Sequence, residues 1–332
     1  MARELKIIMR FVVRSFCAPA FLLVVMLAYA LGVSPGLADS WREGSPMTTA
    51  RANAGGVLVG EDLYVIGGSG TSGPRAMTEI YDTRGDIWRS AAPLPVGLEQ
   101  FGIAATADKI FVAGGFEVEG GSTLISESAA FWIYDIRTGS WNAAPDMPGT
   151  RVGLSLAAVG DKIYAIGGRG SNPSRVYVFD LGKAEWTTLP AANPSPRSAA
   201  ASVVVGDDIY LIGGASGGRA SARVDILDAS RGVWRSGPSL PSPREGHVAA
   251  LLDGAIHVSG GQSVSPPKTY PEHFVLDVKK GQWRKASPLP TPRHGAIAAA
   301  TDNKLFVVGG APGAGVYTVF TSSDIVDIYT GN

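Results

Sequence analysis

Six times along the chain, a short apolar run typical of a β-strand ends at a pair of glycines. The pairs are Gly67-Gly68, Gly114-Gly115, Gly167-Gly168, Gly213-Gly214, Gly260-Gly261 and Gly309-Gly310. Successive pairs are 47, 53, 46, 47 and 49 residues apart. A period near 50 residues predicts an array of small repeated sheets. A unit of this size cannot bury its own apolar face, so neighbouring units must stack to form a continuous core.

Each repeat predicts four short strands. The runs that end at the glycines are rich in β-branched and aromatic residues, and they cover 62–66, 109–113, 162–166, 208–212, 255–259 and 304–308. Another apolar run precedes each of them, and a third follows at 79–82, 132–135, 176–180, 224–228 and 274–277. A polar turn then leads to a tryptophan, at Trp88, Trp141, Trp186, Trp234 and Trp283. Four antiparallel strands per repeat make one blade of a β-propeller.

The last repeat lacks its tryptophan strand. It ends at residues 325–332, while an unmatched Ser40-Trp41, followed by Pro46-Met47, stands at the other end of the repeat array. We expect the N-terminal segment to supply the outer strand of the last blade. That exchange would close a ring of six blades and protect its edge strands.

The double glycine, the Tyr-Asp pair, the tryptophan and a following Pro-x-x-Arg segment resemble the kelch repeat. The resemblance covers residues 39–332 in six registered copies. It implies an all-β, six-bladed kelch propeller closed by the N-terminal strand. Known kelch propellers include adaptors, lectin-like binders, oxidases and sugar-isomerising enzymes, so the fold alone does not give the function.

The first 38 residues do not follow the repeat. Four basic residues precede an uncharged stretch at 15–35, and small residues Gly36 and Ala38 precede a plausible cleavage point before Asp39. This layout predicts a secretory signal peptide over 1–38, cleaved after Ala38, and a propeller over 39–332. The alternative is an uncleaved membrane anchor formed by residues 15–35. Either outcome places the propeller on the export side of a membrane, so we expect a periplasmic or secreted protein.

The composition limits which metal, cofactor and nucleic-acid sites we expect in this chain. Cys17 is the only cysteine and is lost with the signal, so the mature chain has no thiolate metal site and no disulfide. It also lacks the cysteine needed for the cysteine–tyrosine crosslink of galactose oxidase-type propellers. We expect no metal and no cofactor. The mature chain keeps 25 Lys and Arg residues against 28 Asp and Glu residues, with no basic run, so nucleic acid is not an expected partner. We expect a monomer.

Five repeats carry an arginine after the tryptophan strand. They are Arg51, Arg151, Arg197, Arg244 and Arg293, and Leu98 takes the position in the second repeat. Antiparallel connectivity puts these residues on the face that carries the loops after the glycine pairs, around the mouth of the central channel. The guanidinium groups are therefore candidates for binding an acidic ligand, since arginine donates two parallel hydrogen bonds to a carboxylate. The alternative is a structural role, in which each arginine binds backbone carbonyl groups between blades.

Residues that depart from the repeat are the other candidates for the site. Glu99 and Gln100 break the arginine rule, and Glu245, His247 and His294 add acidic and titratable groups near the same rim. Glu99 is the candidate catalytic residue if the protein is an enzyme, because a carboxylate facing a histidine can support general acid–base chemistry. The alternative for each of these residues is that it lies at the rim with its polar groups satisfied and has no role in binding or catalysis.

Three aromatic residues in the variable loops of this face complete the candidates. Phe116, Tyr270 and Tyr317 are expected to stack on a sugar or pack against a partner. Variable loops on a rigid scaffold are the usual place for binding specificity.

Three functions are compatible with these features. The first is an exported binding module for a protein, peptide or glycan on the arginine face, where an acidic ligand would suit the arginines. The second follows from a resemblance to exported sialic acid mutarotases, which implies a metal-free sugar-acid mutarotase or epimerase of the N-acetylneuraminate epimerase type. The third is a structural propeller within a larger envelope complex.

Overall fold

The computed structural model describes residues 39–118 and 124–331. The predicted signal peptide at 1–38 lies outside these residues. Within them, no helix is long and apolar enough to cross a membrane.

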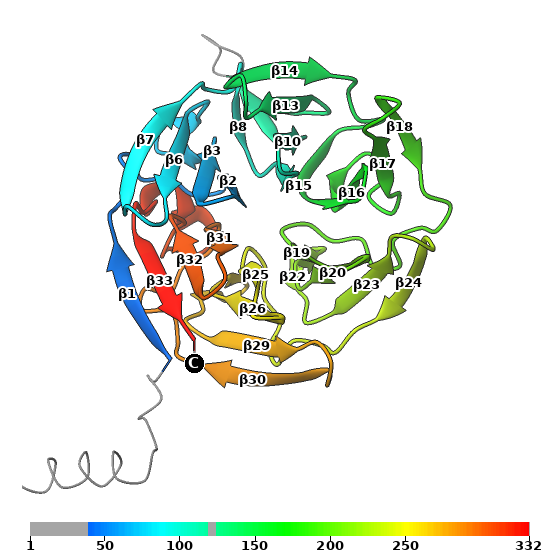
Figure 1. Ribbon diagram of the computed structural model, residues 1–332. Coiled ribbons are helices and arrows are strands. Elements are labelled where there is room, and N and C mark those ends of the chain that lie inside the picture. The colour runs from blue at the N-terminus through cyan, green and yellow to red at the C-terminus, as the bar shows by residue number, and fades with distance from the viewer. Residues whose placement is uncertain (1–38, 119–123, 332) are drawn as a thin grey trace, which may run out of the picture. The chain divides into compact units, whose positions relative to one another are not determined.

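The described residues form six four-stranded antiparallel sheets that surround a central axis (Figure 1). Blade 1 contains β2 (Gly55–Val59), β3 (Asp62–Ile66), β6 (Thr78–Asp82) and β7 (Ile87–Ala91). Blade 2 contains β9 (Gly102–Ala105), β10 (Lys109–Ala113), β13 (Phe131–Asp135) and β14 (Ser140–Ala144). Blade 3 contains β15 (Arg151–Val159), β16 (Lys162–Gly170), β17 (Tyr177–Asp180) and β18 (Glu185–Thr188).

The other three blades continue the ring. Blade 4 contains β19 (Ala201–Val205), β20 (Asp208–Ile212), β23 (Val224–Asp228) and β24 (Val233–Ser236). Blade 5 contains β25 (Val248–Leu252), β26 (Ala255–Ser259), β29 (His273–Asp277) and β30 (Gln282–Ala286). Blade 6 contains β31 (Ile297–Ala300), β32 (Lys304–Val308), β33 (Val326–Thr330) and, as its outer strand, β1 (Ser40–Gly44).

The N-terminal strand closes the ring as the sequence predicts. The ring of Trp41 lies 5.2 Å from that of Tyr329 in β33, and its Nε1 donates a 2.8 Å hydrogen bond to the carbonyl of Ser287 after β30. One apolar cluster joins blade 6 to blade 1 and includes Phe306 and Leu63. The two ends of the repeat array therefore share one sheet and one core.

The core lies between the blades. Each buried apolar cluster in the described residues combines side chains of two neighbouring blades, as with Phe111 and Ile163 between blades 2 and 3. The middle strands supply most of it because they are covered on both faces; Leu63, Val65 and Ile66 of β3 are fully buried. This is the stacking that the small repeat requires.

The glycine pairs join each blade to the next. Both glycines of every pair have a positive φ, a backbone conformation that residues other than glycine rarely adopt. The second N–H of each pair donates to the carbonyl at the arginine position of the following blade, over 2.7–3.0 Å, and the series closes from Gly310 to Arg51. A Cβ on Gly114 would lie 2.4 Å from the carbonyl oxygen of Arg151, so a side chain is also excluded by contact.

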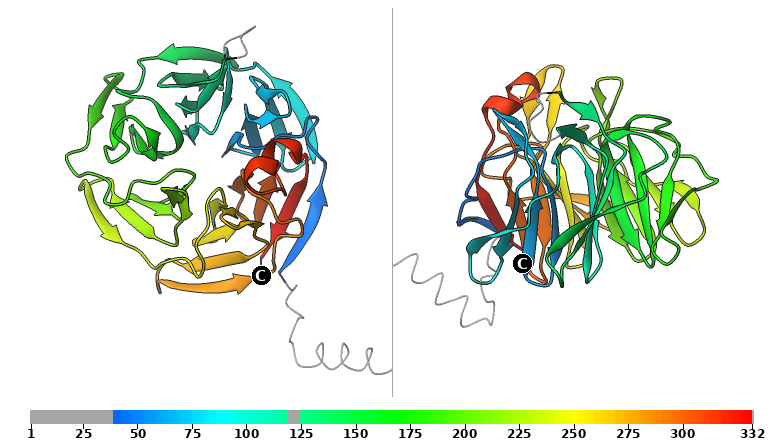
Figure 2. Two further views of the ribbon diagram at one scale, coloured as in Figure 1. Left: turned by 180° about the vertical axis from the view of Figure 1, so that it is seen from behind. Right: turned by 90° about the horizontal axis from the view of Figure 1, so that it is seen from above.

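The loops that follow the glycine pairs lie on one face of the ring, which we call the loop face. In the described residues, small sheets and one helix cover this face. The small sheets pair β4 (Ser69–Gly70) with β5 (Gly73–Pro74), β21 (Ala215–Ser216) with β22 (Arg219–Ala220), β27 (Gln262–Val264) with β28 (Pro267–Thr269), and β11 (Phe116–Val118) with β8 (Gly97–Glu99) and β12 (Ser126–Glu127). The helix is the short 3-10 helix η1 (Gly315–Phe320). Figure 2 shows η1, in red, and the β27–β28 hairpin, in yellow, at the same end of the ring.

Candidate functional site

The five repeat arginines lie inside the blades. Their side chains are buried, with 0–2% of each residue exposed, and none of them belongs to the lining of the cavity described below. Arg197, for example, donates to the carbonyl of Leu211 at 2.8 Å and to the carboxylate of Asp225 at 2.6 Å. The expectation that Arg51, Arg151, Arg197, Arg244 and Arg293 surround the channel mouth is therefore wrong. The alternative is correct in that the arginines bind backbone carbonyl groups, but these carbonyl groups belong to the arginine's own blade and not to a neighbouring one.

The partner of each arginine occupies a fixed position in the third strand of its blade. That position holds Glu79, Tyr177, Asp225, Phe274 and Asp327 in the five blades with arginine. Carboxylates form buried ion pairs there, whereas the rings of Tyr177 and Phe274 lie 4.6 and 4.9 Å from the guanidinium carbons of their arginines. Blade 2 has Leu98 in place of arginine and Trp132 at the partner position. The blade that lacks the arginine therefore also lacks the carboxylate, Tyr or Phe found at the partner position of the other five.

The second residue after each arginine position forms a backbone ring around the channel. Each N–H donates to the carbonyl of the equivalent residue in the preceding blade, over 2.7–3.0 Å, through Asn53, Gln100, Gly153, Ala199, Gly246, Gly295 and back to Asn53. All six residues have a positive φ. Glycine adopts it without strain in three blades, but Asn53, Gln100 and Ala199 adopt it despite their side chains. The ring holds the neighbouring side chains in fixed positions around the axis.

The first residue after each arginine position immediately precedes a residue of this ring in the chain. It pairs with the residue that follows the glycine pair of the same blade. The pairs are Ala52 with Ser69, Glu99 with Phe116, Val152 with Arg169, Ser198 with Ala215, Glu245 with Gln262, and His294 with Ala311. The backbone of these pairs repeats in every blade, but the side chains differ in every blade.

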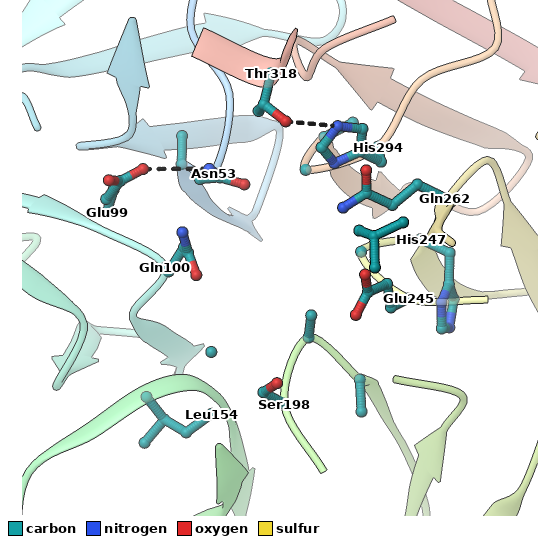
Figure 3. Close-up of a pocket in the computed structure, with 18 of the residues that line it drawn as sticks. Asn53, Glu99, Gln100, Leu154, Ser198, Glu245, His247, Gln262, His294 and Thr318 are labelled. Atoms are coloured by element: carbon teal, nitrogen blue, oxygen red, sulfur yellow. Dashed lines mark hydrogen bonds between the residues drawn. The ribbon is translucent and has the colours of Figure 1, made fainter. Parts of the chain in front are cut away.

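These irregular positions surround a cavity of about 560 Å³ at the channel mouth (Figure 3). Glu99, Asn53 and Gln100 form one wall, and Glu245, Gln262 and His294 form the opposite wall. Ser198 and Leu154 lie along a third side. The lining is rich in carboxylate, amide and hydroxyl groups, which suit a ligand with several hydrogen-bonding groups.

Five of the candidates from the sequence therefore line one cavity: Glu99, Gln100, Glu245, His247 and His294. The two carboxylates differ in their surroundings. Glu99 accepts hydrogen bonds from Ser69 Oγ and, at 3.2 Å, from Asn53 Nδ2. The half-buried carboxylate of Glu245 receives no side-chain hydrogen bond or ion pair from any described residue, and burial raises its pKa.

The two histidines are held neutral by burial. Burial, with the charges of Arg244 and Arg197, lowers the pKa of His247 to about 3. Its imidazole packs against Gly213 of the neighbouring blade rather than reaching across the cavity. Burial also lowers the pKa of His294, whose Nε2 lies 3.0 Å from the carbonyl oxygen of Gly313 and 3.1 Å from Thr318 Oγ1. His294 therefore fastens η1 to the cavity wall.

The three aromatic candidates lie outside the cavity lining. The guanidinium carbon of Arg169 lies 4.8 Å from the centre of the Phe116 ring, so the two groups stack. Tyr270 packs on Arg244 at 4.9 Å, so it supports blade 5. Tyr317 is 60% exposed on η1, next to the cavity.

Other lining residues were not singled out by the sequence. Arg169 supplies a cationic group to the lining, and Asn53, Gln262, Ser198 and Thr318 supply polar groups. Each occupies one of three repeat positions, the first or second residue after the arginine position or the residue after the glycine pair, or lies on η1, so aligning the six repeats at the glycine pairs could have found most of them. Among the described residues, no group of three or more metal-ligating side chains is close enough to hold a metal ion.

Family models match most of the chain. The KLHDC2/KLHL20/DRC7 Kelch-repeats domain matches residues 100–310, and the Kelch motif matches residues 50–95. Kelch-like protein terF of Aspergillus terreus is 27% identical over 69% of this chain and 53% of its own length. Human Kelch-like protein 34 is 29% identical over 54% of this chain and 29% of its own length. The chain thus spans about half or less of these relatives.

A solved structure, that of YjhT, has the same fold. Its TM-score with this chain is 0.73 at 17% sequence identity, and the match covers 86% of this chain and 99% of YjhT. With the model match over residues 100–310 and the blade structure above, these comparisons lead to one conclusion. The chain belongs to the kelch-repeat family of β-propellers.

Proposed function

We propose that the protein is a binding module that takes part of a protein, peptide or glycan ligand into the loop-face cavity. One observation carries the proposal: the arginines that conform to the repeat are buried inside the blades, whereas five of the residues that depart from it line one cavity. A scaffold repeated six times with one irregular polar cavity is a common arrangement for binding on a rigid fold.

A cavity-filling variant tests this proposal. Ser198→Trp places a large side chain in the lining, and Ser236→Trp, on the exposed outer strand β24, is its matched control. The mature protein is screened against neutral sugars, sugar acids and a random-peptide display library. We expect binding to the wild type and to Ser236→Trp, and its loss in Ser198→Trp. Ligands that bind all three proteins equally, or no ligand at all, would contradict the proposal.

A sugar-acid mutarotase is the second candidate. Glu99 and Glu245 stand on opposite walls in different environments, as a proton donor and a proton acceptor need. Opening the sugar ring requires a proton at the ring oxygen and removal of one from the anomeric hydroxyl. Because burial raises the pKa of Glu245, this residue suits the donor role. Accelerated anomer equilibration of N-acetylneuraminate, lost in Glu245→Gln, would support it; uncatalysed rates would dispose of it.

We also propose that residues 1–38 direct export. N-terminal sequencing of the protein recovered from the periplasmic or extracellular fraction should begin at Asp39. Recovery only from the cytoplasm, with Met1 retained, would contradict export, whereas a membrane-bound chain that retains these residues would indicate the anchor.

A further inference from the structure

We propose that the propeller docks a protein segment in which a lysine or arginine stands beside apolar residues. The cationic side chain enters the cavity toward Glu245, and its apolar neighbours cover helix η1. This inference rests on the proposed binding function and names its partner.

The charge of the cavity favours a cationic group. With the five repeat arginines buried in the blades, its lining holds the carboxylates of Glu99 and Glu245 against the guanidinium of Arg169. Arg169 comes from blade 3 and rests on Phe116 of blade 2, whereas Glu245 comes from blade 5. A ligand carboxylate would add a third negative charge to the cavity. The acidic ligand that the sequence favours therefore fits the structure less well than a basic one.

Glu245 is a charged group of the lining whose carboxylate receives no hydrogen bond or ion pair from the described residues. Its backbone is fixed by two hydrogen bonds with Gln262, of 3.1 and 2.8 Å, so the side chain is held on the cavity wall. A half-buried carboxylate has lost part of its hydration, and a charge-assisted hydrogen bond from an ammonium or guanidinium group would replace it. Glu99 already has two donors and can add a longer-range attraction from the opposite wall.

An exposed apolar surface adjoins the cavity. Val316, Tyr317 and Phe320 of η1 are 79%, 60% and 74% exposed, and Val264 of β27 is 36% exposed. Element β27 packs on η1, and Val264 also lines the cavity. We call these four residues the apolar platform. Large apolar side chains gathered in this way mark interaction surfaces.

The platform is fastened to the cavity wall. The N–H of Gly315 donates to Gln262 Oε1 at 2.8 Å, and Thr318 hydrogen-bonds His294. All four of these residues line the cavity. A bound segment can therefore place one side chain in the cavity and its neighbours on η1. Lysine and arginine suit this position because their methylene stems cover apolar surface while the charged end reaches inward.

An unbiased random-peptide display library tests the inference on the mature protein. We expect wild-type protein to enrich sequences with one lysine or arginine next to leucine, phenylalanine or similar residues. Glu245→Gln should weaken the selected peptides about tenfold or more, the scale of a charge-assisted hydrogen bond. Glu185→Gln, on the exposed outer strand β18, should leave affinity unchanged. Glu245→Arg should invert the preference toward acidic peptides.

The platform has its own variants. Val316→Ser with Phe320→Ser should weaken the same peptides about fivefold while keeping the preference for a basic residue, because these changes remove apolar area and no charge. Ile87→Ser, at an exposed apolar position on the outer strand β7, is the control. Raising the salt concentration should weaken binding to the wild type and have less effect on Glu245→Gln.

The contradicting results are also specific. Selected peptides without basic residues, or affinities that Glu245→Gln leaves unchanged, would overturn the inference, as would failure to enrich any peptide. If sugars still bind the wild type and are excluded by Ser198→Trp, the binding function stands and only the choice of partner falls. If nothing binds in a way that Ser198→Trp prevents, both fall together.

Discussion

At the scale of single residues, each repeat arginine and its third-strand partner act as one structural unit. Arg293 and Asp327 have side chains that are 0% and 2% exposed, and the guanidinium also donates to the carbonyl groups of Gly309 and Val307. Such a pair fastens the inner end of a blade to its third strand. Its recurrence follows from the architecture that all blades share, and it therefore carries no information about a ligand.

Removing one member of this pair should destabilise the protein strongly. Arg293→Met leaves the carboxylate of Asp327 buried without its guanidinium partner, so we expect a loss of about 3–5 kcal/mol in the free energy of unfolding. Chemical denaturation measures it. Adding Asp327→Asn should recover part of the loss, because it removes the unpaired charge. A loss below about 1 kcal/mol for Arg293→Met would show that the pair is not structural.

Acid should destabilise the protein through its buried histidines. The pKa of His247 is lowered to about 3 by burial and by Arg244 and Arg197, whereas an unfolded histidine titrates near 6.5. Between these values the unfolded chain binds a proton that the folded chain does not. The neutral imidazole of His247 therefore costs the folded protein no stability above about pH 6.5, and the free energy of unfolding falls as the pH drops from there toward 3.

The matching measurement is unfolding free energy against pH. His247→Leu should flatten the fall between about pH 6.5 and 4, even if its stability at pH 7 differs from that of the wild type. His294, whose pKa burial also lowers, supplies part of the remaining slope. An unchanged slope in His247→Leu would show that this imidazole is not held neutral.

At the scale of elements, the sequence predicts the blades closely. The runs before the glycine pairs coincide with strands β3, β10, β20, β26 and β32, and they form the start of β16. Their pattern is strong because these middle strands are covered by neighbouring blades on both faces. The N-terminal strand was predicted by subtraction, since the last repeat lacks only the piece found around Trp41.

The site could be predicted only in part. Glu99, Gln100, Glu245, His247 and His294 are visible as departures from a regular repeat, and the ring brings them together. The direction of the arginines was not predictable from connectivity alone, because it depends on carbonyl groups and acids contributed by two other strands. Helix η1 and the small loop-face sheets were also missed, since short elements leave little periodicity in a sequence.

The closing strand β1 can be tested through its tryptophan. Trp41 Nε1 bonds the carbonyl of Ser287, whereas Nε1 of Trp234, on the outer strand of blade 4, has no hydrogen-bond partner in the described residues. We expect Trp41→Phe to cost about 1–2 kcal/mol of unfolding free energy and Trp234→Phe to cost less, because only the first loses a hydrogen bond. Equal losses would argue against this contact at the closure.

At the scale of the whole molecule, two closed rings of backbone hydrogen bonds hold the blades in register. One runs through the glycine pairs, and the other runs through the residues from Asn53 to Gly295 that surround the channel. Because all six residues of the second ring line the cavity, the side chains next to them are held at fixed positions around it. The residues that repeat in every blade thus form the scaffold, and the residues that differ between blades form the candidate site.

The buried arginines hold the fold, and we propose that the residues that depart from the repeat bind the ligand. The most direct measurement compares melting temperature and ligand affinity in two variants, with a ligand selected on the wild type. Arg293→Met should lower the melting temperature and leave the dissociation constant of the folded protein within about twofold. Glu245→Gln should keep the melting temperature and raise the dissociation constant about tenfold. The opposite pattern, with affinity lost in Arg293→Met and kept in Glu245→Gln, would show that Arg293 and not Glu245 binds the ligand.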